Sequence, residues 1–323
     1  MMKCQNTYRI EIREIIFLSL MLFSFHQSVV GQQDAQYTQY MYNTLAVNPA
    51  YAGSRGALGI SALHRSQWIG MDGAPNTQTL NINGPLSENV GLGISIVHDE
   101  IGNNTNQSTY FDGTFSYTVA LPETYKLSFG LKAGGHFLNI DFNKLRNYNA
   151  RTVPVGDSEI YKKFSPNIGA GIYLHSPKFY LGISVPNFLE TEHFQNSGTG
   201  NTNIATEKMN WYIISGYVFD LSNSLKFKPA VLFKGVQGVN FQADFSANFL
   251  INEKFTLGAA YRWDSAISAL FGFQVSEKFM LGLAYDREIS ELGGTQFNDG
   301  SFELFLRYEF IKNGKIDLTP RFF

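Results

Sequence analysis

A strict alternation of apolar and polar residues in the second half of the chain constrains the fold more than any other feature. Residues 241–249 read FQADFSANF, with phenylalanine and alanine on one side and polar side chains on the other. Successive side chains of a β-strand point to opposite faces, so this stretch predicts a strand with one apolar and one polar face. Residues 225–234 and 301–310 alternate in the same way and carry full charges on the polar side.

Two architectures accommodate such strands. A soluble sandwich would place large aromatic side chains on the inside of every strand and full charges outside. A membrane barrel has an apolar outer band and a polar, water-accessible interior. Because charges recur opposite the aromatic residues, we predict an all-β fold, a transmembrane antiparallel β-barrel.

Fourteen strands are predicted between residues 58 and 310, which we take as the barrel. The predicted strands are 58–65, 77–84, 90–98, 108–120, 125–142, 164–175, 179–187, 210–220, 225–234, 240–250, 255–263, 266–275, 279–285 and 301–310. Connections after even-numbered strands are short, whereas 143–163, 188–209 and 286–300 are long. Since outer-membrane barrels have short periplasmic turns and longer outer loops, both termini are predicted to lie in the periplasm.

A weak repeat supports this orientation, because three odd-numbered strands open with Lys-Phe-x-Leu-Gly at 178–182, 254–258 and 278–282. The aromatic residue suits the membrane interface, while the lysine reaches past it to water. The glycine on the inward side thins the wall. Pro229 fits poorly, because it removes a backbone donor within the ninth predicted strand; a bulge or a misplaced strand would resolve this.

Charged residues on the polar faces are predicted to line the lumen. These lumen charges are Lys226, Lys228, Lys234, Asp244, Arg262, Glu303, Arg307 and Glu309. Opposite charges on adjacent strands would pair and stiffen a narrow lumen. The alternative is a filter for a solute, because charged linings set the selectivity of pores. Strand number does not decide between them, since fourteen strands lie between small packed barrels and open porins.

The ends of the chain indicate export. In residues 1–31, basic residues precede the apolar run Ile15–Phe25, as in a signal peptide; the alternative is an interfacial helix. The only cysteine, Cys4, lies in this segment, so no disulfide or cysteine-based metal site is expected. The chain has no run of eighteen apolar residues. A formal charge of -2 provides no basic surface for nucleic acid.

Residues 32–57 carry a family resemblance. Residues 33–41 read QDAQYTQYM and residues 48–53 read NPAYAG. This opening is similar to that of the PorP/SprF family, outer-membrane proteins of the type IX secretion and gliding system of Bacteroidota. Residues 64–68, HRSQW, and 320–323, PRFF, also resemble the family. The resemblance implies an outer-membrane location and contacts with periplasmic components of the secretion system. It also implies a role in export or surface retention of secreted proteins such as an adhesin.

The N-terminal segment 32–57 has two interpretations, a plug that covers or fills the barrel and a docking surface for a periplasmic partner. Asp34 could cap one or two helical turns that end at Asn48 and Pro49. The candidate docking residues are Tyr37, Tyr40, Met41, Asn48, Pro49 and Tyr51. Residues 311–323 are expected to form a periplasmic tail.

No catalytic residue, cofactor or metal is predicted. The histidines of the expected mature chain lie in no metal-ligand spacing, and the glycines of the loops precede no helix. His64 with Ser66, or His98 with Ser95, would be the candidates for an outer-membrane lipase. The main alternative to a secretion component is a passive solute channel, or a transporter of hydrophobic solutes, with the N-terminal segment as its plug.

Overall fold

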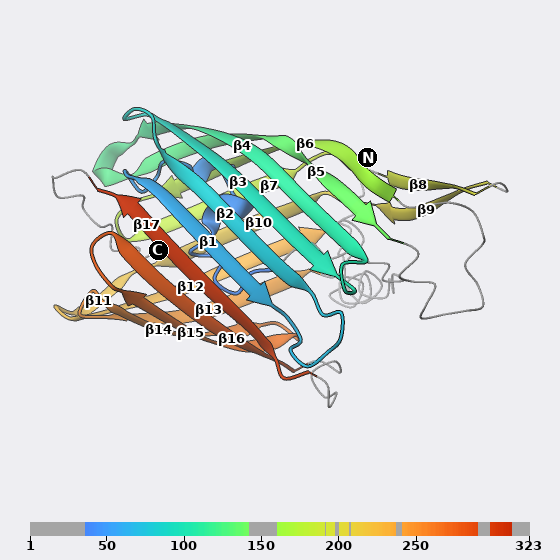
Figure 1. Ribbon diagram of the computed structural model, residues 1–323. Coiled ribbons are helices and arrows are strands. Elements are labelled where there is room, and N and C mark those ends of the chain that lie inside the picture. Colours follow the sequence, from blue (N-terminus) through green and yellow to red (C-terminus); the bar gives the residue numbers. More distant parts are fainter. Residues whose placement is uncertain are drawn as a thin grey trace, which may run out of the picture. The chain divides into compact units, whose positions relative to one another are not determined.

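A closed antiparallel β-barrel of fourteen strands dominates the computed structural model (Figure 1). The structure describes residues 36–141, 160–190, 192–197, 200–206, 208–236, 241–289 and 298–311. The wall strands are β1 (Leu58–Ser66), β2 (Asn76–Pro85), β3 (Val90–Ile101), β4 (Asn106–Ala120), β5 (Lys126–Ile140), β6 (Ile160–His175), β7 (Phe179–Asn187), β10 (Asn210–Tyr217), β12 (Leu225–Val236), β13 (Gln242–Ile251), β14 (Phe255–Arg262), β15 (Ala266–Gln274), β16 (Phe279–Glu288) and β17 (Ser301–Phe310).

The wall closes because each of these strands pairs with a neighbour on both sides. The first and last strands, β1 and β17, pair from Leu58↔Phe310 to Ser66↔Phe302. Strand β10 pairs with β7 on one side and with β12 on the other. In hydrocarbon, where no water can satisfy an open edge, closure of this kind pairs the backbone donors and acceptors. No helix of the described residues is long and apolar enough to cross a membrane.

The predicted strands are confirmed, with ends that differ by a few residues. The structure adds a separate hairpin, β8 (Glu192–Ser197) with β9 (Gly200–Thr206), inside the stretch 188–209 that we expected to be a loop. These two sequences contain few large apolar residues, so hydrophobic periodicity gave no signal for them.

Pro229 lies in β12 without a bulge in the register with β13, where it faces Ala247. The irregularity is on the other side of β12. There β10 ends at Tyr217 and a short strand, β11 (Phe219–Ser222), takes over the pairing with β12. A proline lacks a backbone donor, and the interruption of the neighbouring strand lies opposite it.

The two faces of the wall follow the predicted alternation. Outward positions carry exposed apolar side chains, such as Phe245 on β13 and Leu283 on β16, whereas Asp244 and Glu303 on the inward side are buried. The structure therefore has the apolar outside and polar inside that define an outer-membrane barrel.

The two ends of the barrel differ. We call the end with the turns before β3, β5, β7, β12, β14 and β16 the short-turn end and the opposite end the long-loop end. Residues 36–57 lie inside the barrel, where the blue segment of Figure 1 runs between its walls. This segment contains one α-helical turn, α2 (Thr44–Val47), which ends before Asn48, and the 3-10 turn η1 (Pro49–Tyr51). Another 3-10 turn, η2 (Pro122–Thr124), precedes β5.

This segment runs through the barrel from the long-loop end to the short-turn end, and the N-terminus, which we predict to lie in the periplasm, precedes the described residues. Gln36 contacts Gln242 and Arg262 at the long-loop end, while Arg55 pairs with Glu309 near the short-turn end. The chain therefore descends through the lumen before it enters β1. Asp34, the predicted signal peptide 1–31 and residues 312–323 lie outside the described residues.

We expect a charge on the outer face to destabilise the barrel strongly. Leu283 is an exposed, outward residue in the middle of β16. Leu283→Arg should lower the free energy of unfolding by about 2–4 kcal/mol, because the guanidinium would lie in hydrocarbon. Urea unfolding in lipid vesicles measures this change, with Leu283→Ala as the control for lost side-chain volume. Equal midpoints for the two variants would contradict a lipid-facing position.

Candidate functional site

The candidate site is the lumen segment, by which we mean residues 36–57. Tyr40, Met41, Tyr42 and Leu45 are between 2% and 6% exposed, and Ala50 is fully buried. These side chains pack against the inward faces of the wall strands, in one cluster with apolar residues from both halves of the barrel. The described part of the lumen is thus occupied by the protein's own chain.

Inward glycines of the wall make room for the backbone of the lumen segment. A Cβ atom at Gly130 on β5 would overlap the backbone of Ala50, and one at Gly91 on β3 would overlap the carbonyl of Ala52. Only glycine permits so close an approach of two backbones. The η1 turn therefore fits closely against the wall at these two glycines.

The glycines of the Lys-Phe-x-Leu-Gly repeat serve the same purpose in two of its three copies. A Cβ at Gly182 would lie 2.7 Å from the side-chain nitrogen of Asn48, and one at Gly282 would overlap the side-chain oxygen of Gln39. The wall is thin there, as expected. The structure shows in addition that side chains of the lumen segment fill the space.

Buried charges hold the start of the lumen segment. Arg65 on β1 pairs with Asp286 on β16 at 2.7 Å and with Glu303 on β17 at 3.4 Å. The same Glu303 carboxylate accepts hydrogen bonds from the backbone nitrogens of Thr38 at 3.0 Å and Gln39 at 2.8 Å. We call these five residues the Arg65 cluster. It ties three strands and the lumen segment together through charge-assisted hydrogen bonds.

Further polar contacts follow the segment toward the short-turn end. The Ser184 hydroxyl donates to the carbonyl of Val47 at 2.6 Å, and the Ser116 hydroxyl donates to that of Ala52 at 2.7 Å. The Asn48 side chain accepts from the backbone nitrogen of Ala50 at 2.9 Å. These buried backbone groups of the segment are thus paired, either with the wall or within the segment, as buried polar groups require.

An aromatic contact anchors the middle of the segment. The ring of Tyr42 stacks on Phe305 of β17 with centroids 5.2 Å apart, and Tyr51 meets Tyr173 of β6 edge to face at 5.7 Å. Phe305 is an inward residue with no exposed surface. Aromatic rings on two distant wall strands, β17 and β6, therefore contact the lumen segment.

The predicted docking residues all lie in the lumen segment, inside the barrel. They are Tyr37, Tyr40, Met41, Asn48, Pro49 and Tyr51. Five of the six are buried, and Tyr37 is half-buried with its hydroxyl 3.2 Å from that of Thr79. A partner could reach these side chains only if the segment moved, so docking on them stays a prediction.

The predicted lumen charges face inward, and most are buried. The buried ones are Lys228, Lys234, Asp244, Arg262, Glu303, Arg307 and Glu309. Arg262 binds both carboxylate oxygens of Asp244, at 3.1 and 3.2 Å. Lys226 lies at the short-turn rim, where it pairs with the exposed Glu253 at 3.0 Å. Pairing of neighbours is what a stiffening network requires.

The buried charges that come from the first half of the chain were not identified from the sequence. Arg65 and Arg55 were not among the predicted charges, nor was the buried pair of Lys132 with Asp112 at 3.0 Å. Their positions carried a usable signal, because Arg65, Asp112 and Lys132 occupy the inward register of β1, β4 and β5.

Two kinds of chemical site can be checked in the structure, a metal site and the His–Ser pairs of the predicted lipase alternative. Within the described ranges, no group of three His, Cys, Asp or Glu side chains is placed to hold a metal. His64 Nε2 lies 3.2 Å from the Ser66 hydroxyl near the long-loop end of β1. This contact alone makes no nucleophile, because the base of such a site is itself oriented by a third group.

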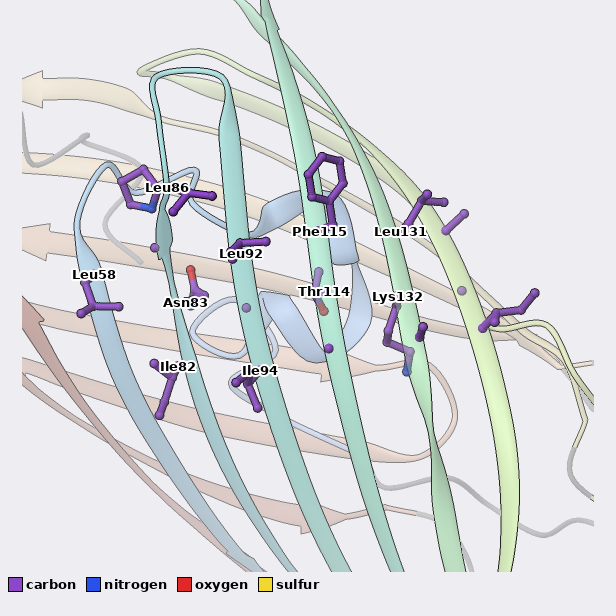
Figure 2. Close-up of a pocket in the computed structure, with 18 of the residues that line it drawn as sticks. Leu58, Ile82, Asn83, Leu86, Leu92, Ile94, Thr114, Phe115, Leu131 and Lys132 are labelled. Carbon is purple, nitrogen blue, oxygen red and sulfur yellow. The ribbon is translucent and has the colours of Figure 1, made fainter.

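A second feature is an apolar hollow of about 930 Å³ on the outer face of β1 to β6 (Figure 2). Small residues, among them Gly113 and Ala133, line it together with larger side chains such as Ile94, Phe115 and Leu131. These side chains are exposed on the outward face. In a membrane this surface meets lipid tails rather than a soluble ligand.

Comparison with known proteins places this barrel in a family. Residues 29–308 match the sequence model of the type IX secretion system membrane protein PorP/SprF. The chain belongs to the PorP/SprF family. It is therefore an outer-membrane barrel with a role in type IX secretion. No curated protein matches the sequence.

Solved structures similar to this PorP/SprF protein are outer-membrane barrels. A deletion mutant of the monoaromatic hydrocarbon channel TodX has a TM-score of 0.50 and 12% identity, covering 83% of this chain and 94% of its own. The outer membrane protein Omp33 of Acinetobacter baumannii has a TM-score of 0.46 and 8% identity, covering 79% and 98%. At such low identity the likeness to TodX shows the fold alone.

We expect the Arg65 cluster to keep the lumen segment in place. Arg65→Met would leave two buried carboxylates without their cation, a loss of about 3–5 kcal/mol in comparable buried pairs. In a Cys4→Ser background, a reporter Thr44→Cys should then react with a maleimide much faster than in the parent. Lys226→Met, which removes only a rim pair, is the matched control. Equal labelling rates would show that the cluster does not hold the segment.

The close approach of Gly130 to the backbone of Ala50 gives a second prediction. Gly130→Val should displace residues 49–52, because its side chain needs the space of Ala50. Gly113→Val on β4 is the matched control, since a Cβ there faces outward with its nearest neighbour at 3.7 Å. Chymotrypsin should cut after Tyr51 in the first variant and spare it in the second. If Tyr51 were protected from chymotrypsin in both variants, the lumen segment would not be packed closely against Gly130.

Proposed function

We propose that this chain is a non-enzymatic component of the type IX secretion and gliding machinery that supports the export or surface retention of secreted proteins. The occupied lumen carries this proposal. From Thr38 to Ala52, nearly every residue of the lumen segment is buried within the wall. A barrel filled by its own chain is suited to be a rigid anchor for other proteins rather than an open pore.

Two surfaces suit this role. The short-turn end would meet periplasmic components, and the lumen segment would contribute its docking residues there if it left the barrel. The long loops 143–163 and 188–209 would meet a secreted client such as an adhesin, because binding surfaces concentrate on loops held by a rigid scaffold. Most of the first loop lies outside the described residues, while the second contains the β8–β9 hairpin.

The alternative is a gated solute channel in which the lumen segment is a removable plug. One observation favours it, a cavity of about 70 Å³ between the segment and the wall, lined among others by Tyr37, Asp112 and Lys132. This space would widen into a path if the segment left. The charged residues around it would then select solutes.

A pull-down of the tagged, full-length protein from cell envelopes tests the secretion role. We expect periplasmic components of the secretion system to co-purify, and loss of the gene to reduce surface display of a secreted protein. Leu283→Ala serves as the matched variant, because it changes only the lipid face. Absence of secretion components from both preparations, together with unchanged surface display, would refute the proposal.

Conductance in planar bilayers separates the alternative. The parent protein should be closed, because its lumen is filled. A steady, solute-dependent current through the parent protein would favour the channel. A current that arises only in Gly130→Val would show that the lumen segment is what closes the barrel.

A further inference from the structure

A polar pocket at the long-loop end is separate from the lumen. It has a volume of about 350 Å³ and lies between the β1–β2 loop, residues 67–75, and the β3–β4 turn, residues 102–105. Its lining extends onto the adjoining strand ends at Ser66, Asn76 and Glu100. We call it the rim pocket. Its size is at the lower end of the range for small-molecule sites.

The walls of the rim pocket are fixed before any ligand binds. The backbone nitrogen of Gly102 donates to the carbonyl of Gly73 at 2.8 Å, which joins the two loops directly. The Asn103 side chain donates to the Asp72 carboxylate at 2.9 Å across the same gap. Preorganised walls lower the entropy lost on binding.

The β1–β2 loop is also braced from its other side. Its closing bond runs from the backbone nitrogen of Gln67 to the carbonyl of Pro75 at 3.0 Å. Ile69 exchanges two backbone hydrogen bonds with the stretch before β17, to Gly300 at 2.9 Å and from Asp299 at 2.8 Å. Two other connections of the barrel, the β3–β4 turn and the stretch before β17, thus hold this wall of the pocket.

The lining is rich in groups that bind hydroxyls. Carboxylates come from Asp72 and Glu100, and carboxamides from Gln67, Asn76, Asn103 and Asn104. Carboxylates accept hydrogen bonds, whereas carboxamides both donate and accept, which matches hydroxyls that do both. Asp72, Asn103 and Asn104 are exposed, so their polar groups can reach a molecule in the pocket.

The same lining excludes other ligand classes. It contains two carboxylates and no lysine or arginine, so an anion such as phosphate would be repelled. It also lacks a group of three His, Cys, Asp or Glu side chains that could hold a metal, as does the rest of the described chain. Ile69, Met71 and Ile101 add apolar surface beside the polar groups. A sugar ring has the same mixture of hydroxyls and apolar faces.

We propose that the rim pocket binds one neutral hexose unit of a cell-surface glycan. Longer loops of outer-membrane barrels lie outside, where such glycans are found. The sugar could belong to the lipopolysaccharide of the same membrane or to a secreted polysaccharide, since the hydroxyl chemistry is shared. The inference requires the outer-membrane location and not the proposed secretion role.

Saturation-transfer NMR on the full barrel in detergent micelles tests the proposal. The probes are methyl glycosides of glucose, galactose, mannose and N-acetylglucosamine, each at millimolar concentration, with putrescine and calcium as separate probes. We expect saturation transfer to at least one glycoside and weaker binding in Glu100→Gln, by roughly tenfold, because one charge-assisted hydrogen bond is lost. Asp264→Asn, which changes an exposed aspartate between β14 and β15, should bind as the parent does.

The outcomes separate the proposal from its competitors. Asn104→Gly is a second variant that removes a carboxamide but keeps the positive φ of this exposed turn. Binding that weakens in both pocket variants and not in Asp264→Asn supports the site, and competition of the glycoside with immobilised lipopolysaccharide or with secreted polysaccharide identifies the source. No transfer to any glycoside, equal binding in all variants, or binding of putrescine or calcium alone would overturn it.

Discussion

Lipid offers no hydrogen bonds, and this absence governs the structure. A strand in hydrocarbon must find partners on both sides, so the sheet has to close on itself. The closure pairs β1 with β17, the first and last wall strands in the sequence. Once the wall is closed, its outer face is committed to apolar side chains. Charged side chains in the middle of the strands, such as Asp244 and Glu303, therefore point to the interior.

The interior that results is not a water-filled pore along the described chain. Shape and charge divide the task of holding the lumen segment. Glycines such as Gly130 provide the close approach near the short-turn end, and the Arg65 cluster fixes the other end. Buried ion pairs add little net stability by themselves. Here their value lies in specifying one position of a segment that could otherwise slide.

Sequence periodicity was enough to predict the wall and too local to predict its contents. The alternation around Phe245 identified a strand and its faces, and the spacing of turns gave the number of strands. Nothing in a two-residue period says which strands carry the partners of Glu303, because Arg65 is 238 residues away in sequence. The β8–β9 hairpin was not predicted because its sequence lacks an apolar face. The direction of the lumen segment was not predicted because it depends on contacts with the closed barrel.

The lumen segment is joined to the wall by a single covalent connection. It leads directly into β1, and β1 forms the seam with β17, the last strand that the structure describes. Because the segment precedes the first wall strand and is not a loop between two strands, it can pass through the mouth of a closed cylinder. Sealing the seam and filling the interior are therefore separable steps, and the contents can be withdrawn without opening the container.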